Sequence, residues 1–176
     1  MSEPPSYPPA AQPPAQPSGL PSALANLTPS TLLWAQVGGA AVVLISIFLP
    51  WVTVSAGMFG STSGNGFDAG AYGALLLILS LAAGALAFIE VRGIRIQGLN
   101  LPGFVPLALA SAMLVIAFIA WLDVLNSTGG SEFEGLEVLG ADFGVSSGIG
   151  IWLVLLAALV TFAAALLPVL KARKAG

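Results

Sequence analysis

Five carboxylates lie close together in one segment of the sequence, and they are the side chains best suited to chemistry: Asp123, Glu132, Glu134, Glu137 and Asp142. Clustered carboxylate oxygens are the ligands that Ca²⁺ prefers in proteins, so a calcium site is the first hypothesis to consider. Their spacing departs from the EF-hand loop, which places acids at alternate positions around a central glycine. A solvated acidic loop accounts for the same residues. We therefore predict no metal site.

Other catalytic chemistry lacks its usual residues in this sequence. The chain contains no histidine and no cysteine, which removes the commonest general base, the thiol nucleophile and the usual transition-metal ligands. Gly64-Asn65-Gly66 is a turn, and no Lys-Ser/Thr pair follows it as in a P-loop. We predict no enzymatic activity, no cofactor and no nucleic-acid partner.

The composition indicates that the chain lies in a membrane. It is 57% hydrophobic and 7% charged, whereas about a quarter of the residues in a soluble domain are charged. A helix rises about 1.5 Å per residue, so about 20 apolar residues cross a hydrocarbon core of about 30 Å. We predict an all-α protein in which residues 31–170 form a bundle of four transmembrane helices. The apolar runs place these helices at about 32–54, 69–91, 104–122 and 149–170.

The first 30 residues have a different composition from the rest. They hold most of the chain's 13 prolines, mixed with Ala, Gln and Ser. Proline lacks the amide donor that regular structure needs, and little in this segment is apolar, so we predict that residues 1–30 are a disordered tail. Pro4-Pro5-Ser6-Tyr7 matches the PPxY pattern of WW-domain ligands. A chance match in a proline-rich segment is the simpler interpretation.

The distribution of charge predicts the orientation in the bilayer. All five basic residues fall in two segments: Arg92, Arg95, Lys171, Arg173 and Lys174. With four crossings, both segments and the N-terminal tail share one side of the membrane, and the acidic loops 55–68 and 123–147 share the other. Lys and Arg are enriched in cytoplasmic loops. We predict a multi-pass plasma-membrane protein with both termini in the cytoplasm, residues 171–176 forming a basic C-terminus.

The two halves of the sequence resemble each other. Phe48-Leu49-Pro50-Trp51 aligns with Phe118-Ile119-Ala120-Trp121, and Gly66-Phe67-Asp68 resembles Asp142-Phe143. Both hairpins start on the same side, so a duplication would be a parallel repeat. Any two transmembrane hairpins share aromatic residues and glycine-rich turns, and chance similarity stays open. We expect Trp51 in the aromatic belt at the membrane surface.

Few polar side chains fall inside the predicted helices. They are Gln36, Ser46, Ser80, Ser111 and Thr161. Ser and Thr in transmembrane helices usually bond to carbonyls of their own helix or join neighbouring helices, so a substrate path along them is disfavoured. Small residues four apart predict close helix contacts. These are Ala35 with Gly39, Ser80 with Gly84, Ala108 with Ala112, and Ala157 with Thr161 and Ala165.

The layout resembles the small four-helix membrane proteins, of no assigned function, that are common in actinobacteria. The tail 1–30, Pro50-Trp51, Gly66-Phe67-Asp68 and the terminal basic residues carry this resemblance. It implies a tetraspan envelope protein and brings no activity with it. We expect a structural or accessory membrane protein that associates with other membrane proteins, or with itself, through its helices, outer loops or tail. The alternative is a small transporter or channel component that acts as an oligomer.

Overall fold

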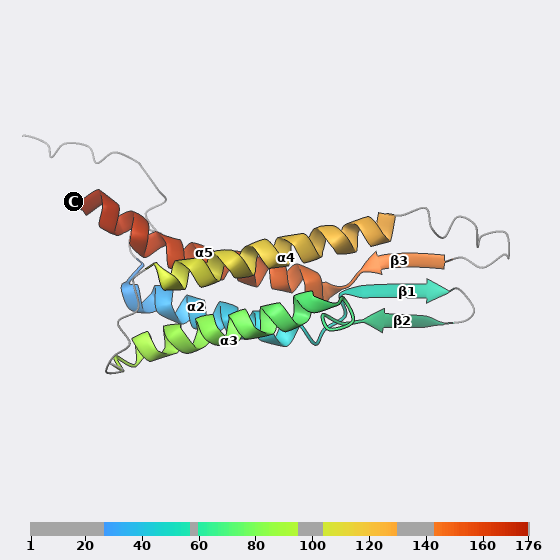
Figure 1. Cartoon of the computed structure of the whole chain (residues 1–176), viewed down its shortest axis with the longest axis horizontal. Coiled ribbons are helices and arrows are strands. Elements are labelled where there is room, and N and C mark those ends of the chain that lie inside the picture. Colours follow the sequence, from blue (N-terminus) through green and yellow to red (C-terminus); the bar gives the residue numbers. More distant parts are fainter. Residues whose placement is uncertain (1–26, 57–59, 95–103, 130–142, 176) are drawn as a thin grey trace, which may run out of the picture.

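The computed structural model describes residues 27–56, 60–94, 104–129 and 143–175. This part of the chain is mostly helical, with the helices α2 (Pro29–Ser46), α3 (Ala71–Val91), α4 (Val105–Gly129) and α5 (Ile149–Ala175). Each helix is long and apolar enough to cross a membrane. Helix α2 packs against α3 and α5, and α4 packs against the same two helices (Figure 1). The four helices therefore surround a common core.

A small sheet extends from one end of the helices, so the predicted all-α class omits part of the fold. Its strands are β1 (Val52–Ala56), β2 (Ser61–Gly64) and β3 (Phe143–Ser147), in the order β2-β1-β3 with both pairs antiparallel. In the register, Thr53 faces Ser63 on one side and Ser146 on the other. Val and Thr alternate along β1, and β-branched residues favour strands. We call this end of the molecule the sheet end (Figure 1).

The opposite end carries the described basic side chains, and we call it the basic end. Arg92 follows α3, and Lys171 and Arg173 lie in the last turns of α5. The Lys171 ammonium donates a hydrogen bond to the Leu27 carbonyl oxygen at 3.1 Å, which connects the end of α5 to the chain before α2. The Thr28 hydroxyl accepts from the Thr31 amide at 3.3 Å and caps the start of α2.

Helix α2 ends at Ser46 and does not continue to residue 54 as predicted. Proline has no amide donor and disfavours helical geometry at the residue before it, so Pro50 prevents the helix from continuing through Leu49. The chain turns after Ser46 and enters β1. At about 1.5 Å per residue, the 18 residues of α2 span about 27 Å, close to the thickness of the hydrocarbon core.

Helix α4 continues to Gly129, beyond the predicted end at residue 122. Val124 is buried, so the apolar face of the helix extends past the charged residue Asp123. Asp123 lies within the helix, on its exposed face, and not in the loop after it. A single carboxylate that reaches water does not stop a helix whose opposite face still packs.

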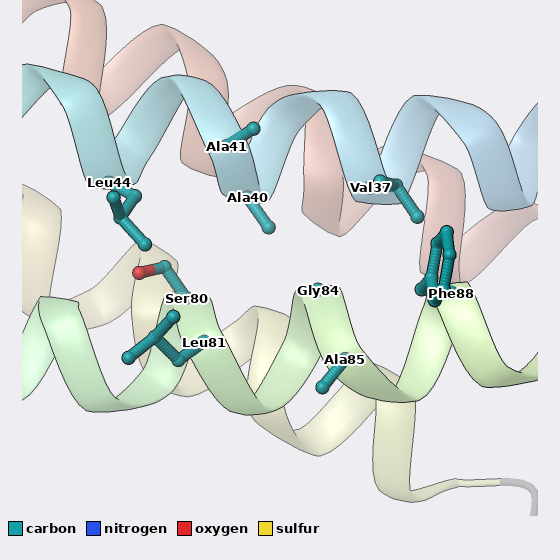
Figure 2. Close-up of a pocket in the computed structure, with 9 residues that line it drawn as sticks. All are labelled: Val37, Ala40, Ala41, Leu44, Ser80, Leu81, Gly84, Ala85 and Phe88. Carbon is teal, nitrogen blue, oxygen red and sulfur yellow. The ribbon is translucent and has the colours of Figure 1, made fainter.

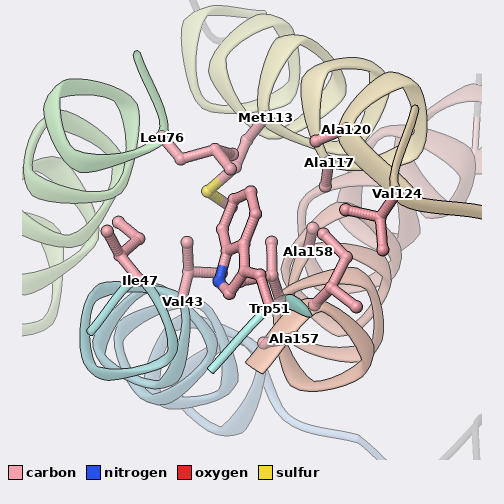
Figure 3. Packing of buried hydrophobic residues seen from close by; sticks show 12 residues of the cluster. Val43, Ile47, Trp51, Leu76, Met113, Ala117, Ala120, Val124, Ala157 and Ala158 are labelled. Atoms are coloured by element: carbon pink, nitrogen blue, oxygen red, sulfur yellow. The ribbon is translucent and has the colours of Figure 1, made fainter. Parts of the chain in front are cut away.

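The core lies between the four helices and is centred on Trp51 (Figure 3). Larger side chains from three helices belong to the same buried cluster as the indole, among them Leu76, Met113 and Ile151, all fully buried. Alanines fill the remaining helix contacts and allow the backbones to approach. These are Ala117, Ala120, Ala157 and Ala158.

Candidate functional site

Trp51 is buried in the protein and does not lie in the lipid-facing belt, so that expectation is wrong. It is 0% exposed and lies among the four helices (Figure 3). Its indole Nε1 donates to the Ser46 carbonyl oxygen at 3.0 Å. That carbonyl belongs to the last turn of α2, and it also accepts from the Leu49 amide at 3.2 Å. The tryptophan therefore fills the core with its ring and caps α2 with its nitrogen.

Backbone hydrogen bonds connect the segment around Trp51 to distant parts of the chain. The Trp51 amide donates to the Gly64 carbonyl at 2.8 Å, and the Trp51 carbonyl accepts from the Gly148 amide at 2.7 Å. The Pro50 carbonyl accepts from the Gly150 amide at 2.8 Å. Buried backbone groups need such partners when no water is available. We call Trp51 with Gly66, Gly148 and Gly150 the tryptophan anchor.

Glycine is required at the tryptophan anchor because its neighbours leave no room for a side chain. A Cβ on Gly66 would lie 2.7 Å from Cζ2 of Trp51, and one on Gly150 would lie 2.7 Å from Cδ1 of the same ring. A Cβ on Gly148 would overlap the Pro50 carbonyl group. In the sequence, Gly148 and Gly150 stand beside the predicted start of the helix 149–170, and no local feature indicates this role. Their partner lies about a hundred residues earlier, at Pro50 and Trp51, a distance that local pattern does not cover.

The sheet presents an open edge on β2. Ser61, Thr62 and Ser63 are exposed, and β2 is bonded to another described strand on one side alone. The other outer strand, β3, lies beside α4. After β2 the chain is fixed by a turn, in which the Asn65 amide donates to the Asp68 carboxylate at 2.7 Å. The strand β2 is therefore held in place by its pairing with β1 and by the turn that follows it.

The described charges at the sheet end are acidic. Asp68 and Asp123 are both exposed there. Glu132, Glu134 and Glu137 lie outside the described residues, as does Asp142. Within the described ranges, no three acidic, His or Cys side chains come together in a group that could hold a metal ion.

The buried hydroxyls bond to their own helices, as predicted. Ser46 donates to the Val42 carbonyl at 2.7 Å, and Thr161 donates to the Ala157 carbonyl at 2.8 Å. Ser80 donates to the Leu77 carbonyl at 3.0 Å. Donors used in this way are not available to a solute.

The two segments that the sequence aligned have different structures. Phe48-Leu49-Pro50-Trp51 forms a turn into β1, whereas Phe118-Ile119-Ala120-Trp121 continues helix α4. Alanine stands at the position of Pro50, so nothing interrupts the helix there. Trp121 packs against Trp152 with ring centroids 5.6 Å apart and contacts the core cluster as a partly buried side chain, whereas Trp51 is fully buried within the cluster. The predicted duplication is therefore not reproduced at these residues.

A scan against protein-family models finds no matching family, and searches of the curated proteins and of the solved structures find no match.

Proposed function

We propose that the protein is an accessory protein of the plasma membrane that binds another membrane protein through its outer sheet. The supporting observation is the open edge of β2, held on a packed core by the tryptophan anchor. Both termini are proposed to be cytoplasmic, as the positive-inside rule predicts, which places the sheet outside the cell. The likeness to actinobacterial tetraspan proteins fits this proposal.

The edge of β2 is suited to an extended segment of a partner. An exposed strand edge offers backbone donors and acceptors, and a partner can add a further strand to it. Ser61, Thr62 and Ser63 are small, so side chains would not obstruct the approach. The affinity would come from backbone hydrogen bonds.

Charge indicates which partner is favoured. The segments that join the helices at the sheet end, residues 47–70 and 130–148, contain acids and no Lys or Arg. A second copy would bring the same negative charge to this end, and like charges oppose association. We therefore propose a partner whose extended segment carries Lys or Arg.

Transport through a single copy is disfavoured by the packing. Trp51 fills the space between the helices, and the described hydroxyls bond to carbonyls of their own helices. A solute would have to displace a fully buried indole and its hydrogen bond to Ser46. An accessory role requires no such opening.

Two neighbouring substitutions test the role of the sheet edge. Successive amides of a strand point to opposite edges, so Thr62→Pro and Ser63→Pro remove one amide that faces β1 and one that faces away. We expect one variant to lose thermal stability. The other should melt like the wild type and lose its partners when purified in mild detergent and analysed by mass spectrometry.

The same purification distinguishes a basic partner from a second copy of the chain at the edge of β2. A basic partner should be released at high salt, because screening weakens exposed charge pairs. If the variant that melts like the wild type keeps every co-purifying protein, the proposal is wrong. A homodimer lost in the same variant would show that a second copy occupies the edge.

A further inference from the structure

An apolar groove of about 350 Å³ runs between α2 and α3 on the outside of the helices (Figure 2). Two small residues, Ala40 and Gly84, line the groove from opposite helices, and a Cβ on Gly84 would be 3.2 Å from that of Ala40. Leu44 lies toward one end of the groove, and Val37 and Phe88 lie toward the other. The groove therefore follows the helices, which is the direction of acyl chains in a bilayer.

A cation lies next to one end of this groove. Arg92 is exposed, and its guanidinium carbon is 5.1 Å from the centroid of the Phe88 ring. Phe88 itself lines the groove. Among the described residues no carboxylate pairs with Arg92, although Glu90 is exposed two residues before it. A planar guanidinium binds phosphate oxygens well, and it can use two donors at once.

We propose that the groove and Arg92 bind an anionic phospholipid. One acyl chain lies over Ala40 and Gly84, and the phosphate bonds to the Arg92 guanidinium. Helix ends are at the depth of the lipid headgroups, so the phosphate and Arg92 meet at the same level. This inference is independent of the proposed role of the sheet.

A second groove provides a comparison within the same molecule. It lies between α4 and α5, measures about 460 Å³, and is lined by apolar residues that include Val115, Phe118 and Leu159. None of its lining residues is charged or in contact with a described cation. Any acyl chain can fill an apolar groove in a membrane. The charge beside Phe88 distinguishes the α2–α3 groove and favours an anionic headgroup.

The test compares lipids and variants of the whole chain. Protein stripped of lipid in mild detergent is titrated with phosphatidylglycerol or with phosphatidylcholine, and the melting temperature and the retained lipid are measured by thermal unfolding and native mass spectrometry. A ligand that binds the folded state raises the melting temperature. We expect phosphatidylglycerol to raise it and to remain bound, and phosphatidylcholine to have a much smaller effect.

Substitutions locate the site. Arg92→Gln should weaken phosphatidylglycerol binding about tenfold, because a charge-assisted hydrogen bond is lost. Arg92→Lys should retain part of the binding. Ala85→Phe should block the groove from its exposed rim without entering the helix contact. The matched control is Val115→Phe in the other groove, which should leave the preference for phosphatidylglycerol unchanged.

Three results would overturn the proposal. Equal stabilisation by the two lipids would show acyl contact without headgroup recognition. Unchanged phosphatidylglycerol binding in Arg92→Gln would remove the assigned phosphate ligand. A lipid-independent dimer that Ala85→Phe dissociates would show that the groove is occupied by a second copy.

Discussion

Trp51 combines two tasks that a transmembrane chain usually assigns to different residues. Its ring fills the core, and its nitrogen satisfies the Ser46 carbonyl at the end of α2. Unsatisfied backbone groups are expensive inside a membrane. The indole and the Leu49 amide both donate to the Ser46 carbonyl, so this end of α2 can be buried.

Replacing Trp51 should lower stability strongly. Trp51→Ala removes a fully buried aromatic side chain, a change that costs about 3–5 kcal/mol in protein cores. Trp51→Phe keeps much of the ring and loses the hydrogen bond, so about 1 kcal/mol is expected. The free energy of unfolding in detergent measures both. Trp34→Ala is the control, since Trp34 is exposed, and a comparable loss there would contradict the anchor role of Trp51.

The sequence placed Trp51 near the end of the predicted helix 32–54 and assigned it to the aromatic belt, but it did not indicate that the indole is buried. Periodicity and belt statistics apply to a single helix facing lipid. The burial of Trp51 depends on contacts with Gly66, Gly148 and Gly150, which come from other parts of the chain. Such contacts are set by tertiary packing, and a local pattern does not contain them.

The helices are the elements that the sequence predicts best. Four apolar runs predict four helices, and the described part of the chain has four that could cross a membrane. Their ends are less predictable. Pro50 shortens α2, and the buried Val124 lengthens α4 beyond Asp123. The strands fall in loops rich in Gly and Ser, where hydropathy gives no signal and pairing depends on residues far apart in the chain.

The contact between α2 and α5 depends on Gly39. A Cβ on this residue would overlap the Thr161 hydroxyl, whereas a Cβ on the neighbouring Gly38 would meet nothing within 4 Å. Gly39→Ala should therefore destabilise the protein by about 1–3 kcal/mol, the cost of overpacking. Gly38→Ala should be neutral or stabilise by up to about 1 kcal/mol, because alanine favours helix. Equal melting temperatures of the two variants would argue against this contact.

The pairing of β1 with β3 joins the two loops of the sheet end, and its register can be tested by a disulfide. Thr53 and Ser146 are direct partners across the strands. The chain has no cysteine, so Thr53→Cys with Ser146→Cys introduces a single pair. Directly opposite residues are close enough to form a disulfide, so we expect oxidation to link the two cysteines. After the chain is cleaved between them, the two fragments should stay together on a non-reducing gel.

A register shift provides the control for that disulfide. Successive side chains of a strand point to opposite faces, so Thr53→Cys with Val145→Cys should stay reduced. Efficient bridging of the shifted pair would mean that the strands pair in another register.

At the scale of the whole molecule, the two ends differ in structure and in charge. The sheet end carries Asp68 and Asp123, and the basic end carries Arg92, Lys171 and Arg173. This asymmetry is the property that the sequence predicts most directly, because it follows from the number of apolar runs and the positions of five basic residues. The direction in which the molecule crosses the bilayer is predicted from the positions of the basic residues.

Single cysteines test the direction of insertion. Ser63 is exposed at the edge of β2, so Ser63→Cys should react with a membrane-impermeant thiol reagent in intact cells. Gln97→Cys, in the segment between α3 and α4, should react after the membrane is permeabilised. Arg92→Glu with Arg95→Glu should increase the fraction of molecules inserted in the opposite direction. The segment between α3 and α4 then has no positive charge, and the three basic residues at the C-terminus are left to set the orientation. Labelling of Gln97→Cys in intact cells would place the basic end outside and remove the sheet from the reach of an extracellular partner.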